Sequence, residues 1–283
     1  MGAMACRSLA MAVLAVAVMG QAKAPAGLAK ARQAYNAGQI DAAIAAAQDV
    51  LKAPALPPAQ ASEAAVVLSR AYLDRYRQHS EPMDLDGARQ ALERVTPSVL
   101  PSGSRVEYLL AQGLFLYYDG CSDGCFGASA EMFKVALGTL GTGPERDRVF
   151  EWWAGALDRQ AQFGPETERS AVYRRLLAGA DAELARDDDS APAAYWAAAA
   201  ARGAGDLERA WSASVSAWIR ARAFGPRGEV LRADLDRFVT QVLLPERARA
   251  IAPDADARPV FATLVGQWEE IKKKYAKVGV LLH

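Results

Sequence analysis

The segment Gly38–Leu51 reads GQIDAAIAAAQDVL and contains the signals that decide the fold. Its glycine permits a tight turn, and the apolar residues that follow recur at the spacing of one helix face. A second segment, Gly205–Trp218, reads GDLERAWSASVSAW and repeats the spacing of glycine, apolar residue and alanine. Because small alanines let neighbouring helices approach closely, both segments predict a turn followed by the second helix of a helix pair.

Helical periodicity continues along nearly the whole chain from residue 28, and no run of alternating β-branched residues persists. Weaker copies of the second-helix pattern occur at Leu85–Val95 and Ala128–Leu137. We expect about four helix pairs, followed by two closing helices near residues 229–251 and 257–275. Pro245 should kink or split the first of these, because proline removes a hydrogen bond and clashes with the preceding turn.

The two quoted segments resemble the turn and second helix of the tetratricopeptide (TPR) repeat, a unit of about 34 residues. This resemblance implies an all-α fold, a right-handed α-solenoid of antiparallel helix pairs, closed by a C-terminal capping helix pair. Repeat lengths vary, and alanine mostly replaces the tryptophan of the first-helix motif. In architecture and location the chain is also loosely similar to periplasmic TPR-like proteins such as the T component of TRAP-type transporters, with no diagnostic motif.

The N-terminus has the pattern of a secretory signal peptide. Arg7 precedes the uncharged apolar run Leu9–Met19, and small residues at Gly20, Ala22 and Ala24 offer cleavage positions. We therefore predict a signal peptide over residues 1–22, a short linker over 23–27 and a single helical-repeat domain over 28–283. An uncleaved anchor is the alternative. The alanine- and arginine-rich composition favours a bacterial source, so the expected location is periplasmic or secreted.

The charges of the chain balance, with 33 lysines and arginines against 33 aspartates and glutamates. A neutral chain generates no global field that would recruit a polyanion or an anionic membrane. We therefore expect no nucleic-acid partner and no strong membrane association after signal removal.

Two cysteines, Cys121 and Cys125, follow the signal segment and lie in a glycine-rich stretch. Outside the cytosol such a pair tends to be oxidised, and the flanking glycines permit the close approach that a disulfide needs. We predict a Cys121–Cys125 disulfide. A redox-active pair is the weaker alternative, because the spacing is C-x-x-x-C. No metal site is expected, since the only histidines, His79 and His283, lie far away in the sequence.

No catalytic signature is present in the sequence. Two histidines offer little for nucleophilic catalysis, and no Gly-x-Ser-x-Gly, Walker or dinucleotide-binding glycine motif occurs. We expect no enzymatic activity and no cofactor. An enzyme with an unrecognised carboxylate site remains the least favoured alternative.

An aromatic concentration near residues 108–153 supplies the candidate binding residues, which are Tyr117, Tyr118, Phe126, Trp152 and Trp153. Neighbours on a helix point about 100° apart, so the two members of an adjacent pair cannot face the same contact equally. One member of each pair could line the inner surface of a curved stack. Core packing of all these side chains is the competing interpretation.

Two further local patterns predict structural roles. Trp211 and Trp218 lie seven residues apart on one helix face, which favours packing over binding. The run Asp187–Ser190 precedes Pro192, and we expect Asp189 or Ser190 to cap the helix that follows.

These observations favour an exported, non-enzymatic module that holds a protein or peptide partner on a concave helical-repeat surface. The alternative is a transport-associated carrier for a hydrophobic, lipid-like small molecule lodged near Tyr118 and Trp153. A carrier needs an enclosed apolar cavity, whereas a scaffold presents an open groove lined by exposed polar and aromatic residues.

Overall fold

The computed structural model describes residues 26–120 and 124–276. Within these ranges the chain contains helices and no strand. The elements are α1 (Ala26–Asn36), α2 (Ile40–Leu51), α3 (Pro58–His79), α4 (Pro82–Glu93), a 3₁₀ turn (Pro97–Val99), α5 (Ser102–Asp119), α6 (Cys125–Leu137), α7 (Pro144–Phe163), α8 (Glu166–Arg186), α9 (Ala191–Gly203), α10 (Leu207–Arg220), a 3₁₀ turn (Ala221–Phe224), α11 (Pro226–Phe238), a π-helical turn (Val239–Leu243), α12 (Leu244–Ile251) and α13 (Arg258–Ala276).

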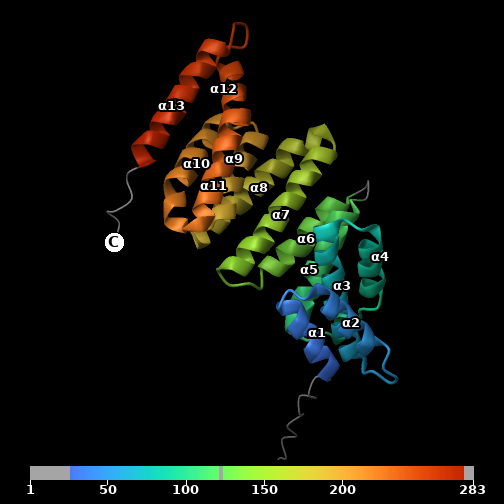
Figure 1. The fold of residues 1–283 in the computed structure, drawn as a ribbon. Coiled ribbons are helices and arrows are strands. Elements are labelled where there is room, and N and C mark those ends of the chain that lie inside the picture. The colour runs from blue at the N-terminus through green and yellow to red at the C-terminus, as the bar shows by residue number, and fades with distance from the viewer. Residues whose placement is uncertain (1–25, 121–123, 277–283) are drawn as a thin grey trace, which may run out of the picture.

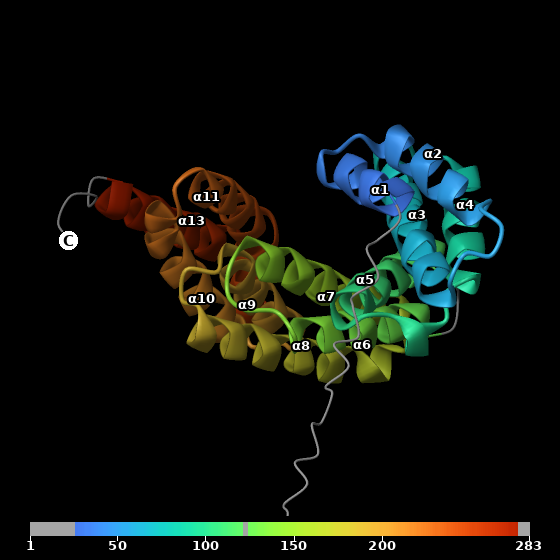
Figure 2. The same ribbon diagram turned by 90° about the horizontal axis from the view of Figure 1, so that it is seen from below.

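The helices pack in sequence order as a curved, solenoid-like stack (Figure 1). The odd-numbered helices from α1 to α11 contact one another, and each even-numbered helix from α2 to α10 packs mainly against its flanking odd-numbered neighbours. In the view of Figure 2, α1, α7 and α11 lie on the inner side of the curve and α4, α6 and α8 on the outer side. The odd-numbered helices therefore form the layer that faces the concavity, which we call the inner surface.

The all-α, solenoid-like arrangement predicted from the repeat pattern is confirmed. The described residues contain five successive pairs, α1/α2 to α9/α10, rather than about four. The relationship to the TPR superfamily and the signal peptide stay predictions, and residues 1–22 lie outside the described residues.

Local sequence explains where the helices begin and end. Pro144 and Pro226 each occupy the first turn of a helix, where the missing backbone N–H would have no intrahelical partner. Gly38 and Gly205, the glycines of the two deciding segments, have φ of 72° and 89°. Glycine adopts this left-handed conformation without steric cost, so these residues permit the tight turns before α2 and α10.

Close packing between helices depends on glycines placed opposite aromatic rings. Gly113 faces Phe133, Gly87 faces Tyr72, and a Cβ atom at these glycines would come within 2.6 and 2.9 Å of the ring carbons. Gly179 packs in the same way against the Trp153 ring, where a Cβ would collide with the indole. Aromatic rings thus fill the space that each glycine leaves, in addition to the alanine contacts that the sequence predicts.

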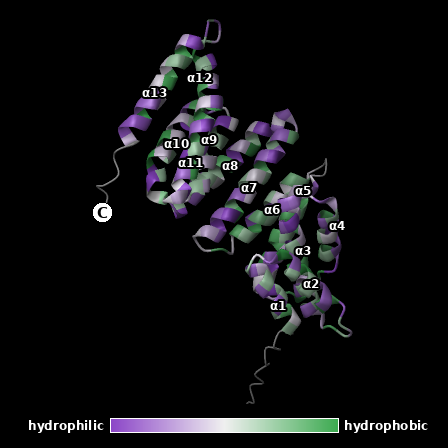
Figure 3. Cartoon of the chain, in the orientation of Figure 1, coloured by the Kyte–Doolittle hydropathy of each residue, from purple (hydrophilic) through white to green (hydrophobic). Residues whose placement is uncertain are grey.

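The hydrophobic core runs along the whole stack as three adjoining clusters, contributed mainly by α1–α3, by α3–α9 and by α9–α13. Hydrophilic residues are spread over the full length of the molecule, as Figure 3 shows, which agrees with helices that each bury one face. No helix within the described residues combines the length and the apolar character that a membrane span requires.

The C-terminal helices close the stack through a buried tryptophan. Trp268 of α13 is fully buried, and the rings of Trp211 and Trp218 meet it edge-on at centroid distances of 5.8 and 5.2 Å. The predicted packing role of these two residues is therefore confirmed. The predicted interruption at Pro245 is also confirmed, because a π-helical turn ends at Leu243 and the proline lies in the first turn of α12.

Candidate functional site

Three inner-surface helices, α7, α9 and α11, line an open cleft of about 560 Å³. Their N-terminal halves lie side by side there, and all of the lining residues come from these three helices or their first turns. We call this feature the α7/α9/α11 cleft; its lining consists of Pro144, Asp147, Arg148, Glu151, Ala191, Pro192, Tyr195, Trp196, Arg227, Val230, Leu231 and Asp234.

Asp147 connects the three helices at one end of the cleft. Its carboxylate accepts a hydrogen bond from Ser190 Oγ at 2.7 Å and forms an ion pair with Arg227 at 3.4 Å. Ser190 is at the same time the N-cap of α9, since its hydroxyl accepts from the backbone N–H of Ala193. The predicted capping role of the Asp187–Ser190 run thus falls to Ser190, and the cap also fixes the distance between α7 and α9.

Glu151, two turns into α7, carries a carboxylate that makes no hydrogen bond and no ion pair within the described residues. Although the side chain is exposed at the cleft mouth, desolvation by the cleft walls raises the pKa of Glu151, and the carboxylates of Asp147 and Asp234 raise it further. Arg148 opposes this shift less strongly. The charge of Glu151 is therefore poorly compensated by its surroundings.

Tyr195 and Trp196 form the α9 wall of the cleft, and their rings lie edge to face at 5.6 Å. Both side chains are half-buried. Burial and the nearby carboxylates of Asp234 and Asp158 raise the pKa of Tyr195. On the opposite wall Val230 is 62% exposed, so this wall presents an aliphatic side chain to the cleft. The cleft thus combines aromatic and aliphatic surface with carboxylates at its edge.

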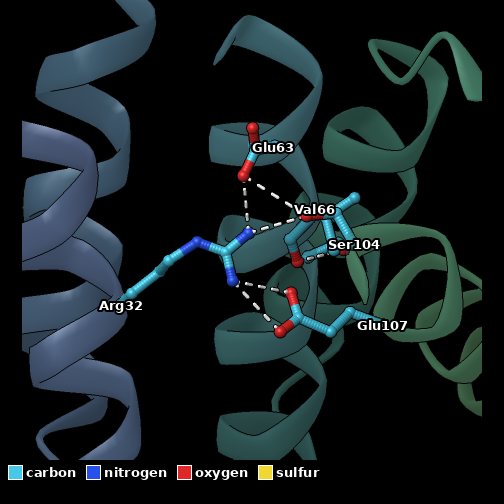
Figure 4. Close-up of polar contacts among 6 residues, drawn as sticks. Arg32, Glu63, Val66, Ser104 and Glu107 are labelled. Atoms are coloured by element: carbon cyan, nitrogen blue, oxygen red, sulfur yellow. Dashed lines mark hydrogen bonds and ion pairs between the residues drawn. The ribbon is translucent and has the colours of Figure 1, made fainter. Parts of the chain in front are cut away.

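In the N-terminal half of the inner surface the charges are compensated internally. The guanidinium of Arg32 on α1 donates to both carboxylate oxygens of Glu107 on α5 at 3.1 Å and to Glu63 on α3 at 2.9 Å (Figure 4). Ser104 Oγ accepts a further bond from Arg32 at 3.0 Å and donates to Glu63 at 3.3 Å. This Arg32 network joins three successive helices and leaves little hydrogen-bonding capacity for a partner.

Three of the five aromatic residues predicted to bind a ligand lie together, but away from the α7/α9/α11 cleft. Tyr117, Tyr118 and Phe126 line a second open cavity of about 460 Å³ where α5 ends and α6 begins, together with Arg159 and Phe163 of α7. The Tyr117 ring meets Tyr118 and Phe126 edge to face at 5.6 and 6.0 Å. We call this cavity the aromatic edge.

Trp152 and Trp153 do not join the aromatic edge. Trp153 is 5% exposed and packs against Phe150 at a ring distance of 5.4 Å, and Trp152 packs against Phe133 at 5.8 Å. Both therefore contribute to the core between α6, α7 and α8. Trp153 fills the space that Gly179 leaves, whereas Trp152 is half-buried at the edge of this core. A binding role for one member of this pair stays a prediction.

Cys125 is buried at the first residue of α6. Its predicted disulfide partner, Cys121, lies outside the described residues, so the pairing stays a prediction. Across residues 26–120 and 124–276 no group of three or more histidine, cysteine or acidic side chains is arranged to hold a metal ion. His79 is exposed at the end of α3, and His283 lies outside the described residues.

The sequence contained a partial signal for the α7/α9/α11 cleft. Tyr195 and Trp196 are an adjacent aromatic pair of the same kind as Tyr117 and Tyr118. The sequence did not point to Glu151, Val230 or Asp234, because acidic and aliphatic residues are common on any helix. Only the three-dimensional structure shows that these three side chains line one cleft.

Comparisons with protein-family models, with curated proteins and with solved structures find no match to this chain. Fold and surface together define an all-α, solenoid-like protein with an open, mixed aromatic and acidic cleft on its inner surface.

Proposed function

We propose that this chain is an exported, non-enzymatic binding module that holds a protein or peptide partner in the α7/α9/α11 cleft. The observation that carries the proposal is the exposed Val230 beside Tyr195 and Trp196 in an open concave surface. Tyrosine and tryptophan in concave, partly desolvated positions are typical of the residues that dominate binding energy at protein interfaces. The export signal predicted over residues 1–22 implies a partner in the periplasm or outside the cell.

Site-specific photo-crosslinking tests this proposal. A photo-reactive amino acid at Val230 should yield a crosslinked polypeptide in the cells that produce the protein, because this position lies in the cleft. Val135 of the outer helix α6 is a matched control, since it is also an exposed valine, at 54% against 62% for Val230. Equal crosslinking from both positions, or none from Val230 in the folded protein, would reject the cleft as the partner site.

A second candidate function is transport of a hydrophobic small molecule in the aromatic edge. It is favoured by the cavity of about 460 Å³ and by Phe163, which is 69% exposed beside Phe126. The cavity is open and includes Arg159, which suits an amphipathic ligand better than a fully apolar one. Native mass spectrometry of protein purified from its own cells should show a bound lipid that Tyr118→Ala removes; its absence from wild-type protein argues against the carrier.

A further inference from the structure

The charged groups that face the α7/α9/α11 cleft come from two of its three helices. Helix α7 contributes Asp147, Arg148 and Glu151, and α11 contributes Arg227 and Asp234, whereas α9 contributes no charged side chain. Arg227 is paired with Asp147, so these two charges compensate one another. Asp234 has only an exposed pair with Arg237 at 3.3 Å, one turn further along α11.

Glu151 is thus the carboxylate without a partner among the described residues of the cleft, and Asp234 is only weakly paired. This contrasts with the Arg32 network, in which one guanidinium satisfies two glutamates and a serine. A poorly compensated carboxylate beside aromatic and aliphatic walls is complementary to a cation on an apolar stem. Lysine and arginine side chains have this construction, since their methylene groups pack on apolar surface while the charged head stays near water.

We propose that a lysine or arginine side chain of the partner enters the α7/α9/α11 cleft, with its methylene groups against Val230 and Trp196 and its cationic head near Glu151 and Asp234. This inference rests on the proposed function and deepens it by stating what the cleft recognises. Trp196 and Tyr195 add to the selection, because aromatic faces attract cations.

Electrostatics within the cleft agrees with this assignment. Burial raises the pKa of both Glu151 and Tyr195, and nearby carboxylates raise it further, whereas Arg148 and Arg237 oppose the two shifts less strongly. The carboxylates around both groups therefore outweigh the cations, which favours an added positive charge. The positive N-terminal ends of α7 and α11 do not cancel the preference for a positive charge at Glu151 and Asp234, because the influence of a helix dipole falls off within the first turn. Glu151 lies at the end of the second turn of α7, and Asp234 lies in the third turn of α11.

A titration followed by NMR tests the proposal directly. The probes are three acetylated and amidated pentapeptides that carry lysine, norleucine or glutamate between pairs of alanines. Norleucine has the lysine stem without the ammonium group. The readout is the indole N–H signal of Trp196, one of six tryptophans in the chain and assigned with a Trp196→Phe variant. The lysine probe should bind about two- to fivefold more tightly than the norleucine probe, the range of one partly exposed charge pair.

Glu151→Gln should remove this preference for lysine. Glu168→Gln is the matched control, because Glu168 is exposed on the outer helix α8 and its change alters the net charge equally. Equal affinity for lysine and norleucine, a preference for glutamate, no shift with any probe, or the same loss in both variants would overturn the inference. Crosslinking from Val230 to a polypeptide, together with any of these results, would leave the proposed function in place and remove only the recognition of a basic residue.

Discussion

Arg32 in the N-terminal half of the inner surface and Glu151 in the C-terminal half are both charged side chains on odd-numbered helices, but their surroundings differ. Arg32 contacts two glutamates and a serine from the next two inner helices (Figure 4). Glu151 has aromatic and aliphatic neighbours, and burial together with the carboxylates of Asp147 and Asp234 raises its pKa. The difference indicates that Arg32 joins three inner helices, as Asp147 does in the C-terminal half, whereas the charge of Glu151 joins no helices within the described residues.

Arg146 extends the comparison to a buried charge, and its substitution should lower the free energy of unfolding more than any of the substitutions that follow. It pairs with Glu183 of α8, with Nη2 2.8 Å from Oε2, and donates to the carbonyls of Leu137 and Leu140. Arg146→Met leaves Glu183 buried without a counter-ion, so the free energy of unfolding should fall by about 3 to 5 kcal/mol in urea denaturation. Arg175→Met, which removes an exposed pair with Glu131, should change it by less than about 1 kcal/mol. Similar losses in the two variants would contradict this ranking by burial.

Gly179→Ala tests whether Trp153 belongs to the core rather than to a binding surface. The added methyl group collides with the indole, so the free energy of unfolding should fall by about 1 to 3 kcal/mol despite the better helix propensity of alanine. Gly266→Ala in α13 is the control, because its new methyl group would meet no neighbouring side chain and no other helix within 4 Å. This variant should stabilise the protein by about 0.5 to 1 kcal/mol. Thermal denaturation distinguishes the two signs, and a stabilised Gly179→Ala would mean that Trp153 is free to move away.

Arg32→Met should destabilise the protein by about 1 to 2 kcal/mol, less than Arg146→Met because the Arg32 network is partly exposed. The loss should be smaller in the double variant with Glu107→Gln, since one of the two uncompensated carboxylates is then neutral. Lys30→Met on the same helix is the control, because Lys30 is exposed and forms no ion pair within the described residues. An equal cost for Lys30 and Arg32 would mean that the network does not join the three helices.

Glu151→Gln should change the free energy of unfolding least, and it should raise this free energy, whereas the three preceding substitutions lower it. A carboxyl group whose pKa is raised in the folded state opposes folding when it is ionised, and this cost disappears below the unfolded pKa of about 4.3. The variant should therefore be slightly more stable than the wild type at neutral pH, and the two should converge as the pH falls below about 4. Urea denaturation across this range measures the difference. If the variant is less stable at pH 7, Glu151 has a stabilising partner and the comparison with Arg32 fails.

Helix positions, the tight turns at Gly38 and Gly205 and the packing role of Trp211 and Trp218 could all be predicted, because each follows from the local spacing of residues. The aromatic site could be predicted only in part. Tyr117, Tyr118 and Phe126 line one cavity, whereas Trp153 is buried in the core. The glycine that accepts its ring is on the next helix, 26 residues later (179 − 153), and nothing in the sequence links the two.

The sequence by itself determined that this chain forms stacked helix pairs, since periodicity, glycine turns and helix-starting prolines act over a few residues. Only the tertiary structure decided which charges find partners. Arg32 meets Glu107 across 75 residues, and Asp147 meets Arg227 across 80. Such contacts depend on how the inner helices are placed by the packing of every pair between them, so the isolation of Glu151 is a property of the assembled stack.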